Sequence, residues 1–171
     1  MKNRINNETQ ALYAPTKHTL NTDQWVNGAL EALHQHFLTE PLFSLRSNTF
    51  TSPDITKNYL TLILARETNE QFHVLFLDNQ HRLIEDNRMF TGTIDGASVY
   101  PRVVAQRALE VNASAVIFAH NHPSGICVPS SADIQITEKL KTCLLTFDIR
   151  VLDHIIVGHM DTYSFAEHGV I

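Results

Sequence analysis

Residues 113–133 constrain the fold and the chemistry of this chain more than any other stretch. The apolar run ASAVIFA leads directly into two histidines that stand two positions apart, His120 and His122. A short apolar run of this kind predicts a buried strand, and residues i and i+2 of a strand point to the same face. A loop rich in Pro, Gly and Ser then leads to Asp133, in the first turn of a predicted helix. We therefore expect two imidazoles and one carboxylate to converge where the strand ends.

This combination of side chains is a common ligand set for a catalytic divalent metal, with a fourth position left for water. The spacing thus predicts a metal site formed by His120, His122 and Asp133. Asp133 has a second interpretation, because Ser130 and Asp133 fit the S-x-x-D pattern of a helix start. Cys127 lies inside the loop and is an alternative ligand, or a small apolar filler.

The same residues carry a resemblance to a known family. The pattern H-x-H-P, followed by Ser and Asp, resembles the JAMM (MPN+) metalloprotease motif. Five positions match it: His120, His122, Pro123, Ser130 and Asp133. A longer pattern that ends at Thr137, together with GTIDGASVYPRVV upstream and VLDHIIVG downstream, is similar to the RadC-like family of that superfamily. The similarity covers roughly residues 52–171.

The resemblance implies an MPN/JAB-like fold and a zinc-dependent hydrolase with one Zn²⁺ per chain. Such a metallopeptidase or isopeptidase would use a metal-activated water on a peptide or protein substrate. Iron or manganese would fit the same ligands. RadC-like proteins also have an association with DNA repair, so the alternative is a non-catalytic or repair-associated module that acts through a protein partner.

Hydrolysis also requires a base that takes a proton from water. The only acid within residues 120–133 is the predicted ligand, so the base must come from elsewhere. Glu67 and Glu70 are the candidates, since both lie at a predicted helix–strand junction. The resemblance favours Glu70, two residues before Phe72, without deciding between them. It also implies that Ser130 donates to the oxyanion, whereas the helix-start pattern makes Ser130 an N-cap.

The order of predicted elements indicates an α/β fold with a mixed β-sheet flanked by helices, and the resemblance implies a cytidine-deaminase-like layering of them. We expect an N-terminal arm and helix in residues 1–51 and the catalytic domain in residues 52–171. The helix at residues 23–38 would pack against the core or a second copy of the chain, which leaves a homodimer open. Predicted elements of the second domain are helices at 52–66, 101–112 and 132–146, and strands at 71–77, 82–89, 113–120, 148–157 and 163–165.

Composition excludes several classes of protein. The net charge is −5 with no basic stripe, so we expect no direct binding of nucleic acid. No apolar run approaches the roughly 20 residues that span a bilayer, and the segment MKNRINNETQ has no apolar core, so we expect a cytoplasmic protein without membrane contact. Two cysteines make no disulfide framework.

Asp153 and His154 form a second polar pair, within the apolar strand pattern VLDHIIVG. A carboxylate beside a histidine could orient a metal ligand or supply another one. It could equally be a buried structural pair, which is the interpretation that we favour from the sequence.

Overall fold

The computed structural model describes residues 52–92, 98–159 and 161–171. The predicted arm and helix within residues 1–51 lie outside the described residues. The observed helices and strands are, in chain order, α3 (Pro53–Leu64), β1 (Gln71–Leu77), β2 (Leu83–Thr91), α4 (Pro101–Glu110), β3 (Ala115–Asn121), α5 (Ser131–Leu145), β4 (Arg150–Val157) and β5 (Thr162–Ser164).

The five strands form one mixed sheet in the order β2-β1-β3-β4-β5. Strands β1 and β2 form an antiparallel hairpin, and β1 also pairs antiparallel with β3. Strands β3 and β4 are parallel, as expected for two strands joined through a helix, here α5. The short strand β5 adds an antiparallel edge to β4. The predicted mixed sheet and α/β class are therefore confirmed.

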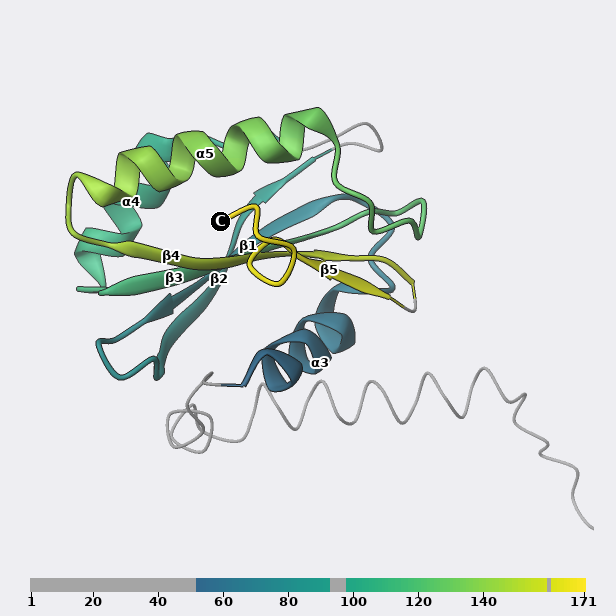
Figure 1. Ribbon diagram of the computed structural model, residues 1–171, viewed down its shortest axis with the longest axis horizontal. Coiled ribbons are helices and arrows are strands. Elements are labelled where there is room, and N and C mark those ends of the chain that lie inside the picture. The colour runs from purple at the N-terminus through teal and green to yellow at the C-terminus, as the bar shows by residue number, and fades with distance from the viewer. Residues whose placement is uncertain (1–51, 93–97, 160) are drawn as a thin grey trace, which may run out of the picture.

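Helices cover both faces of the sheet. Figure 1 shows α4 and α5 together on one face and α3 alone on the other. Each face has its own apolar core, because successive residues of a strand point to opposite sides. Under α4 and α5 the largest buried side chains include Phe76, Phe118 and Leu144, and against α3 they include Leu60, Leu75 and Ile155.

The predicted elements of residues 52–171 are all observed, and their boundaries shift by at most two residues. The helix predicted at 52–66, for example, is Pro53–Leu64, and Ser52 precedes it without a side-chain capping bond. The buried residues of α4 are Val104, Ala105 and Ala108, which share one helical face.

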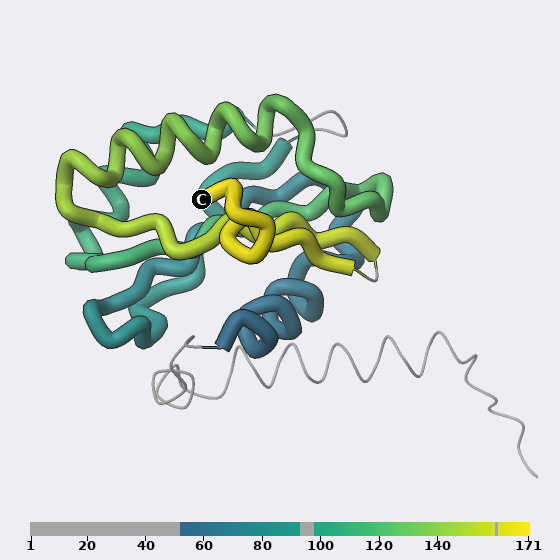
Figure 2. Tube along the Cα trace, viewed as in Figure 1, coloured from purple at the N-terminus to yellow at the C-terminus, as the bar shows by residue number. Residues whose placement is uncertain are grey.

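The loop after β3 lies beside the turn between β4 and β5, as the tube in Figure 2 shows. The His159 N–H donates to the Gly125 carbonyl over 3.4 Å. Gly125 has a φ of +81°, and a Cβ there would lie 2.5 Å from Nδ1 of His159. A glycine is required at this position for both reasons. Among the described residues, no helix is long and apolar enough to cross a bilayer.

Candidate metal site

The two histidines of the motif lie at the end of β3, on the face covered by α4 and α5. His120 is the second-last residue of β3 and pairs with Phe72 of β1 and Ile156 of β4. Its side chain is 1% exposed. His122 follows the strand and its side chain is 19% exposed. Their Nε2 atoms are 3.0 Å apart. The i, i+2 spacing thus places both imidazoles side by side, as the sequence predicted.

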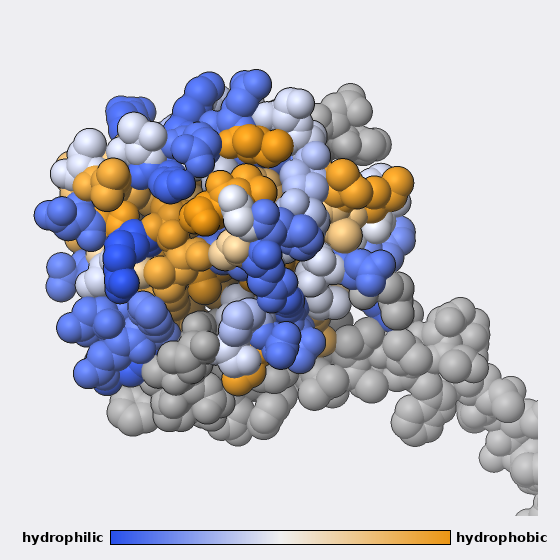
Figure 3. Space-filling model, viewed as in Figure 1, coloured by the Kyte–Doolittle hydropathy of each residue, from blue (hydrophilic) through white to orange (hydrophobic). Residues whose placement is uncertain are grey.

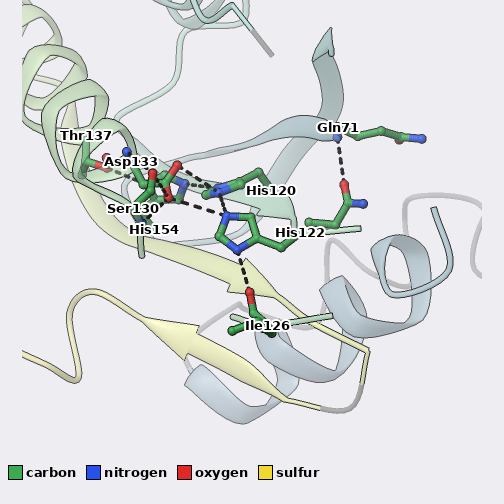
Figure 4. Close-up of polar contacts among 9 residues, drawn as sticks. Gln71, His120, His122, Ile126, Ser130, Asp133, Thr137 and His154 are labelled. Atoms are coloured by element: carbon green, nitrogen blue, oxygen red, sulfur yellow. Dashed lines mark hydrogen bonds and ion pairs between the residues drawn. The ribbon is translucent and has the colours of Figure 1, made fainter. Parts of the chain in front are cut away.

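Asp133 reaches the same point from the first turn of α5. Its Oδ1 lies 3.2 Å from Nε2 of His120, and its Oδ2 lies 3.6 Å from Nε2 of His122. These three residues are the one group of potential metal ligands found among the described residues, with ligand atoms within 4.8 Å of one another. Cys127 is not part of this group. Figure 4 shows the three side chains pointing toward one another.

The carboxylate of Asp133 serves the helix start as well as the site. Its Oδ2 accepts from the backbone N–H of Ser130 over 2.7 Å and from the Ser130 hydroxyl over 2.6 Å, while the Asp133 N–H donates to Ser130 Oγ. This is a complete capping box. The two interpretations of Asp133 are compatible, since Oδ1 faces His120 while Oδ2 completes the cap. The Ser130 hydroxyl is an N-cap in this structure, and its role toward an oxyanion stays a prediction.

The ring of His122 is fixed by the loop that follows it. Its Nδ1 lies 2.7 Å from the backbone carbonyl of Ile126. A carbonyl only accepts, so Nδ1 carries the hydrogen and a neutral His122 leaves Nε2 bare toward the site. The Gly125 N–H in turn donates to the His122 carbonyl over 2.9 Å, which closes a tight turn behind the ring.

The electrostatics of the site favour an anionic carboxylate. Burial alone would raise the pKa of Asp133, but hydrogen bonds with His120 and His122 hold the pKa of this carboxyl far below its usual range. The hydrogen bond with Asp133 raises the pKa of His122, and the charge of Glu70 adds to that effect. A positive charge is therefore stabilised at the point where the three side chains meet.

The donor set fits a divalent metal. Ligands about 2.0 to 2.1 Å from a tetrahedral zinc ion are about 3.3 Å from one another. Here the two Nε2 atoms are 3.0 Å apart and Nε2 of His120 lies 3.2 Å from Oδ1 of Asp133, whereas the 3.6 Å contact of His122 is with Oδ2. Exposure increases from His120 to His122. The site is thus closed toward the core and open toward solvent on the His122 side, where a water or a substrate would enter.

Comparison with known proteins identifies the family of the chain. A family model described as RadC-like JAB domain matches residues 50–170. The chain belongs to the RadC-like JAB domain family. It is 52% identical over 143 residues to a UPF0758 protein of Vibrio cholerae serotype O1 (strain M66-2), covering 84% of this chain and 63% of that protein. It is 49% identical over 146 residues to a UPF0758 protein of Marinobacter nauticus, covering 85% of this chain and 64% of that protein. The chain thus spans less than two thirds of the length of these relatives.

The RadC-like domain holds its two candidate bases in different surroundings. The carboxylate of Glu67 accepts a hydrogen bond from the side-chain amide of Gln71. The Gln71 side chain also contacts His73, so Glu67 is engaged on the α3 side of the sheet. Glu70 is half-buried, and its charge acts on His122. Of the two, Glu70 is the one that is electrostatically coupled to the site.

Asn121 ties the segment that bears Glu70 to the end of β3. Its Oδ1 accepts from the Gln71 N–H over 2.8 Å, and its Nδ2 donates to the carbonyls of Glu67 and Asn69, each over 3.1 Å. Asn121 lies between the two histidines in sequence, but its side chain points to the opposite face. This role of Asn121 was not predicted from the sequence, although the alternation of the strand indicated the direction of the side chain.

The sequence left open whether His154 belongs to the metal site or to a structural pair with Asp153. It is fully buried, and its Nε2 lies 2.9 Å from Nδ1 of His120. Burial lowers the pKa of His154 well below its ordinary value, and the nearby His120 adds to this. Asp153 instead accepts from Ser164 Oγ and from the Ala166 N–H. The pair is therefore divided, with His154 behind the site and Asp153 in a structural cluster.

Proposed function

We propose that this RadC-like domain is a zinc-dependent hydrolase that cleaves peptide or isopeptide bonds. One observation carries the proposal. The Nε2 atoms of His120 and His122 and the carboxylate of Asp133 converge, with contacts of 3.0 to 3.6 Å, at a point closed toward the core and open toward solvent. A purely structural zinc site would usually be closed by a fourth protein ligand, whereas catalytic sites keep three protein ligands and an open position.

The roles of the other residues follow from their positions. When bound, zinc would lower the pKa of water toward about 7 and polarise a carbonyl oxygen. Glu70 takes the proton of the attacking water and returns it to the leaving amine, which general base catalysis requires. Asn121 holds the backbone on both sides of Glu70, at Asn69 and Gln71. Ser130 would donate to the developing oxyanion once its hydroxyl turns away from Asp133.

The surface around the site supports a peptide or protein as substrate. Ile126 and Val128, on the loop that joins His122 to α5, are 64% and 67% exposed. Figure 3 shows apolar side chains over this loop, at the right of the view. Exposed apolar side chains beside a reaction centre are suited to contact apolar side chains of a polypeptide.

The test compares three forms of the chain after purification without chelators. Elemental analysis should find about one zinc per chain in the wild type and in Glu70→Gln, and loss of zinc in His122→Ala. The wild type should cleave members of a peptide and isopeptide library that Glu70→Gln leaves intact. Circular dichroism should show that both variants are folded.

Two outcomes would contradict the proposal. If the wild-type protein bound no added zinc, the proposed zinc-dependent hydrolysis would be contradicted. Zinc binding without turnover of any peptide or isopeptide would favour the alternative of a non-catalytic module that acts through a protein partner, and pull-down experiments would follow.

A further inference from the structure

Two polar side chains, His154 of β4 and Thr137 of α5, lie buried behind the proposed zinc site. They are 0% and 1% exposed. The rings of Phe72, Phe118 and Phe165 surround the His154 imidazole, with centroids 5.5, 5.8 and 4.9 Å away. A polar group in such surroundings is costly unless each of its polar atoms is hydrogen-bonded. The partners of these two residues therefore indicate why they are there.

Their hydrogen bonds form a chain that joins two of the three proposed ligands. His120 Nδ1 lies 2.9 Å from His154 Nε2, and His154 Nδ1 lies 2.6 Å from Thr137 Oγ1. The Thr137 hydroxyl donates to the backbone carbonyl of Asp133 over 2.6 Å. Figure 4 shows Thr137 and His154 beside Asp133, on the side of the site away from Ile126.

The carbonyl at the end of this chain sets the direction of every hydrogen bond in it. A carbonyl only accepts, so the Thr137 hydroxyl donates its one hydrogen to the Asp133 carbonyl. The hydroxyl oxygen can then only accept, and it does so from Nδ1–H of His154. A charged imidazole enclosed by three phenyl rings would be strongly disfavoured, so Nε2 of His154 has no hydrogen. It must then accept from Nδ1–H of His120, and a neutral His120 is left with a bare Nε2 that faces His122 and Asp133.

We propose that Thr137 and His154 are positioning residues that hold His120 in the tautomer with a bare Nε2, ready to bind a metal. This inference rests on the proposed zinc site for its purpose, but the tautomer itself is a property of the metal-free protein. The opposite tautomer would place a hydrogen on Nε2 of His120, between the three ligand atoms, and zinc could not bind there. Residues that orient a ligand histidine in this way typically contribute 10- to 100-fold to metal affinity.

The first experiment compares Thr137→Val with Thr137→Ser in the full 171-residue chain. Valine has nearly the shape of threonine but no hydroxyl, whereas serine keeps the hydroxyl. Competition with a chromophoric chelator should show zinc affinity about 10- to 100-fold weaker in Thr137→Val, and close to wild type in Thr137→Ser. Wild-type affinity in a folded Thr137→Val protein would overturn the proposal.

A matched control separates positioning from general loss of stability. Ser164→Ala removes another buried hydroxyl, which donates to Asp153 Oδ2 over 2.6 Å and does not contact the ligands. We expect it to lower the urea midpoint as Thr137→Val does, but to leave zinc affinity unchanged. An equal loss of zinc affinity in Ser164→Ala would assign Thr137 a structural role only and would overturn the proposal.

The second experiment reads the tautomer directly in zinc-free protein. Long-range ¹H–¹⁵N spectra of histidine-labelled protein, with His120 assigned by substitution, should show the hydrogen on Nδ1 in the wild type and in Thr137→Ser. Thr137→Val should show both tautomers. A wild-type His120 with its hydrogen on Nε2 would refute the proposal. This measurement decides the question even if the wild type binds no zinc, which is the separate failure of the proposed function.

Discussion

Asp153 and His154 are neighbours on β4 and both are buried, yet they belong to two polar clusters of different design. Asp153 accepts hydrogen bonds from Ser164 and from the backbone of Ala166, and we call these three residues the Asp153 cluster. His154 joins the site cluster, made with His120, His122, Asp133 and Thr137. Alternation along the strand separates the two side chains, because successive residues point to opposite faces.

The two clusters differ in how acceptors and donors are matched. The Asp153 carboxylate accepts from Ser164 Oγ, from the Ala166 N–H and from the His154 N–H, over 2.6 to 2.9 Å. Every donor there has its acceptor, so the cluster stabilises the fold by itself. In the site cluster, bare nitrogens and a carboxylate oxygen face one another, and only a cation or a proton can stabilise them. A polar cluster in which every donor has an acceptor thus indicates a structural role. A cluster in which several acceptors face one another indicates a site that binds a cation.

Among these substitutions, Asp153→Ala is expected to lower the free energy of unfolding the most. The substitution leaves two buried donors and one partly buried donor without an acceptor, and we expect the free energy of unfolding to fall by about 4 kcal/mol. Urea denaturation of the zinc-free protein measures this. A fall of less than about 1 kcal/mol would show that water replaces the carboxylate and that the cluster is not structural.

Added zinc should stabilise the protein through the site cluster alone. At a free zinc concentration 100 times the Kd, the free energy of unfolding should rise by about 3 kcal/mol, because zinc binds the folded chain only. His122→Ala should show no rise, and Ser164→Ala should show the same rise as the wild type. Stabilisation of His122→Ala by zinc would place the metal elsewhere in the chain.

Asn121→Asp tests whether the segment before β1 is held independently of the metal. The new carboxylate could still accept from Gln71, but it would meet the carbonyls of Glu67 and Asn69 without a hydrogen to donate. We expect a loss of about 2 kcal/mol in unfolding free energy and faster hydrogen exchange of the Gln71 amide. Zinc affinity should be unchanged, because the side chain points away from the ligands. A large loss of zinc affinity would instead make Asn121 part of the site.

The smallest effect concerns a surface ion pair that belongs to neither cluster. The hydrogen bond from Arg107 lowers the pKa of Glu85 below its ordinary value. A carboxyl with a lowered pKa in the folded state contributes stability above its unfolded pKa of about 4.3, and loses it as the pH falls through the folded pKa. Glu85→Gln should thus have a slightly lower urea midpoint than the wild type at pH 7, and the difference should vanish in acid. A difference that grows on acidification would contradict this assignment.

The sequence was sufficient wherever the signal is local. The apolar run before His120 predicted a buried strand, and the spacing of two residues predicted that both imidazoles share a face. The S-x-x-D pattern predicted the start of α5 at Ser130, and the structure shows the full capping box. These predictions succeed because strand alternation and helix capping depend on residues close together in the chain.

The sequence was insufficient wherever a residue is defined by its neighbours across the sheet. We favoured a structural role for the pair of Asp153 and His154. The hydrogen bonds of Asp153 with Ser164 and Ala166 are in line with that interpretation, whereas His154 contacts His120. The contact of His154 with His120 depends on β3 and β4 lying side by side, a property of sheet order. Nor could spacing separate Glu67 from Glu70, since both precede the same strand.

By itself, the sequence determined the family, the order of the elements and the three side chains that converge at the end of β3. Only the tertiary structure decided that Asn121 anchors the segment around Glu70 and that Thr137 and His154 stand behind His120. The physical reason is that a hydrogen bond requires two atoms within about 3 Å. Folding sets that distance for residues 17 and 34 positions apart, as for His154 with Thr137 and with His120.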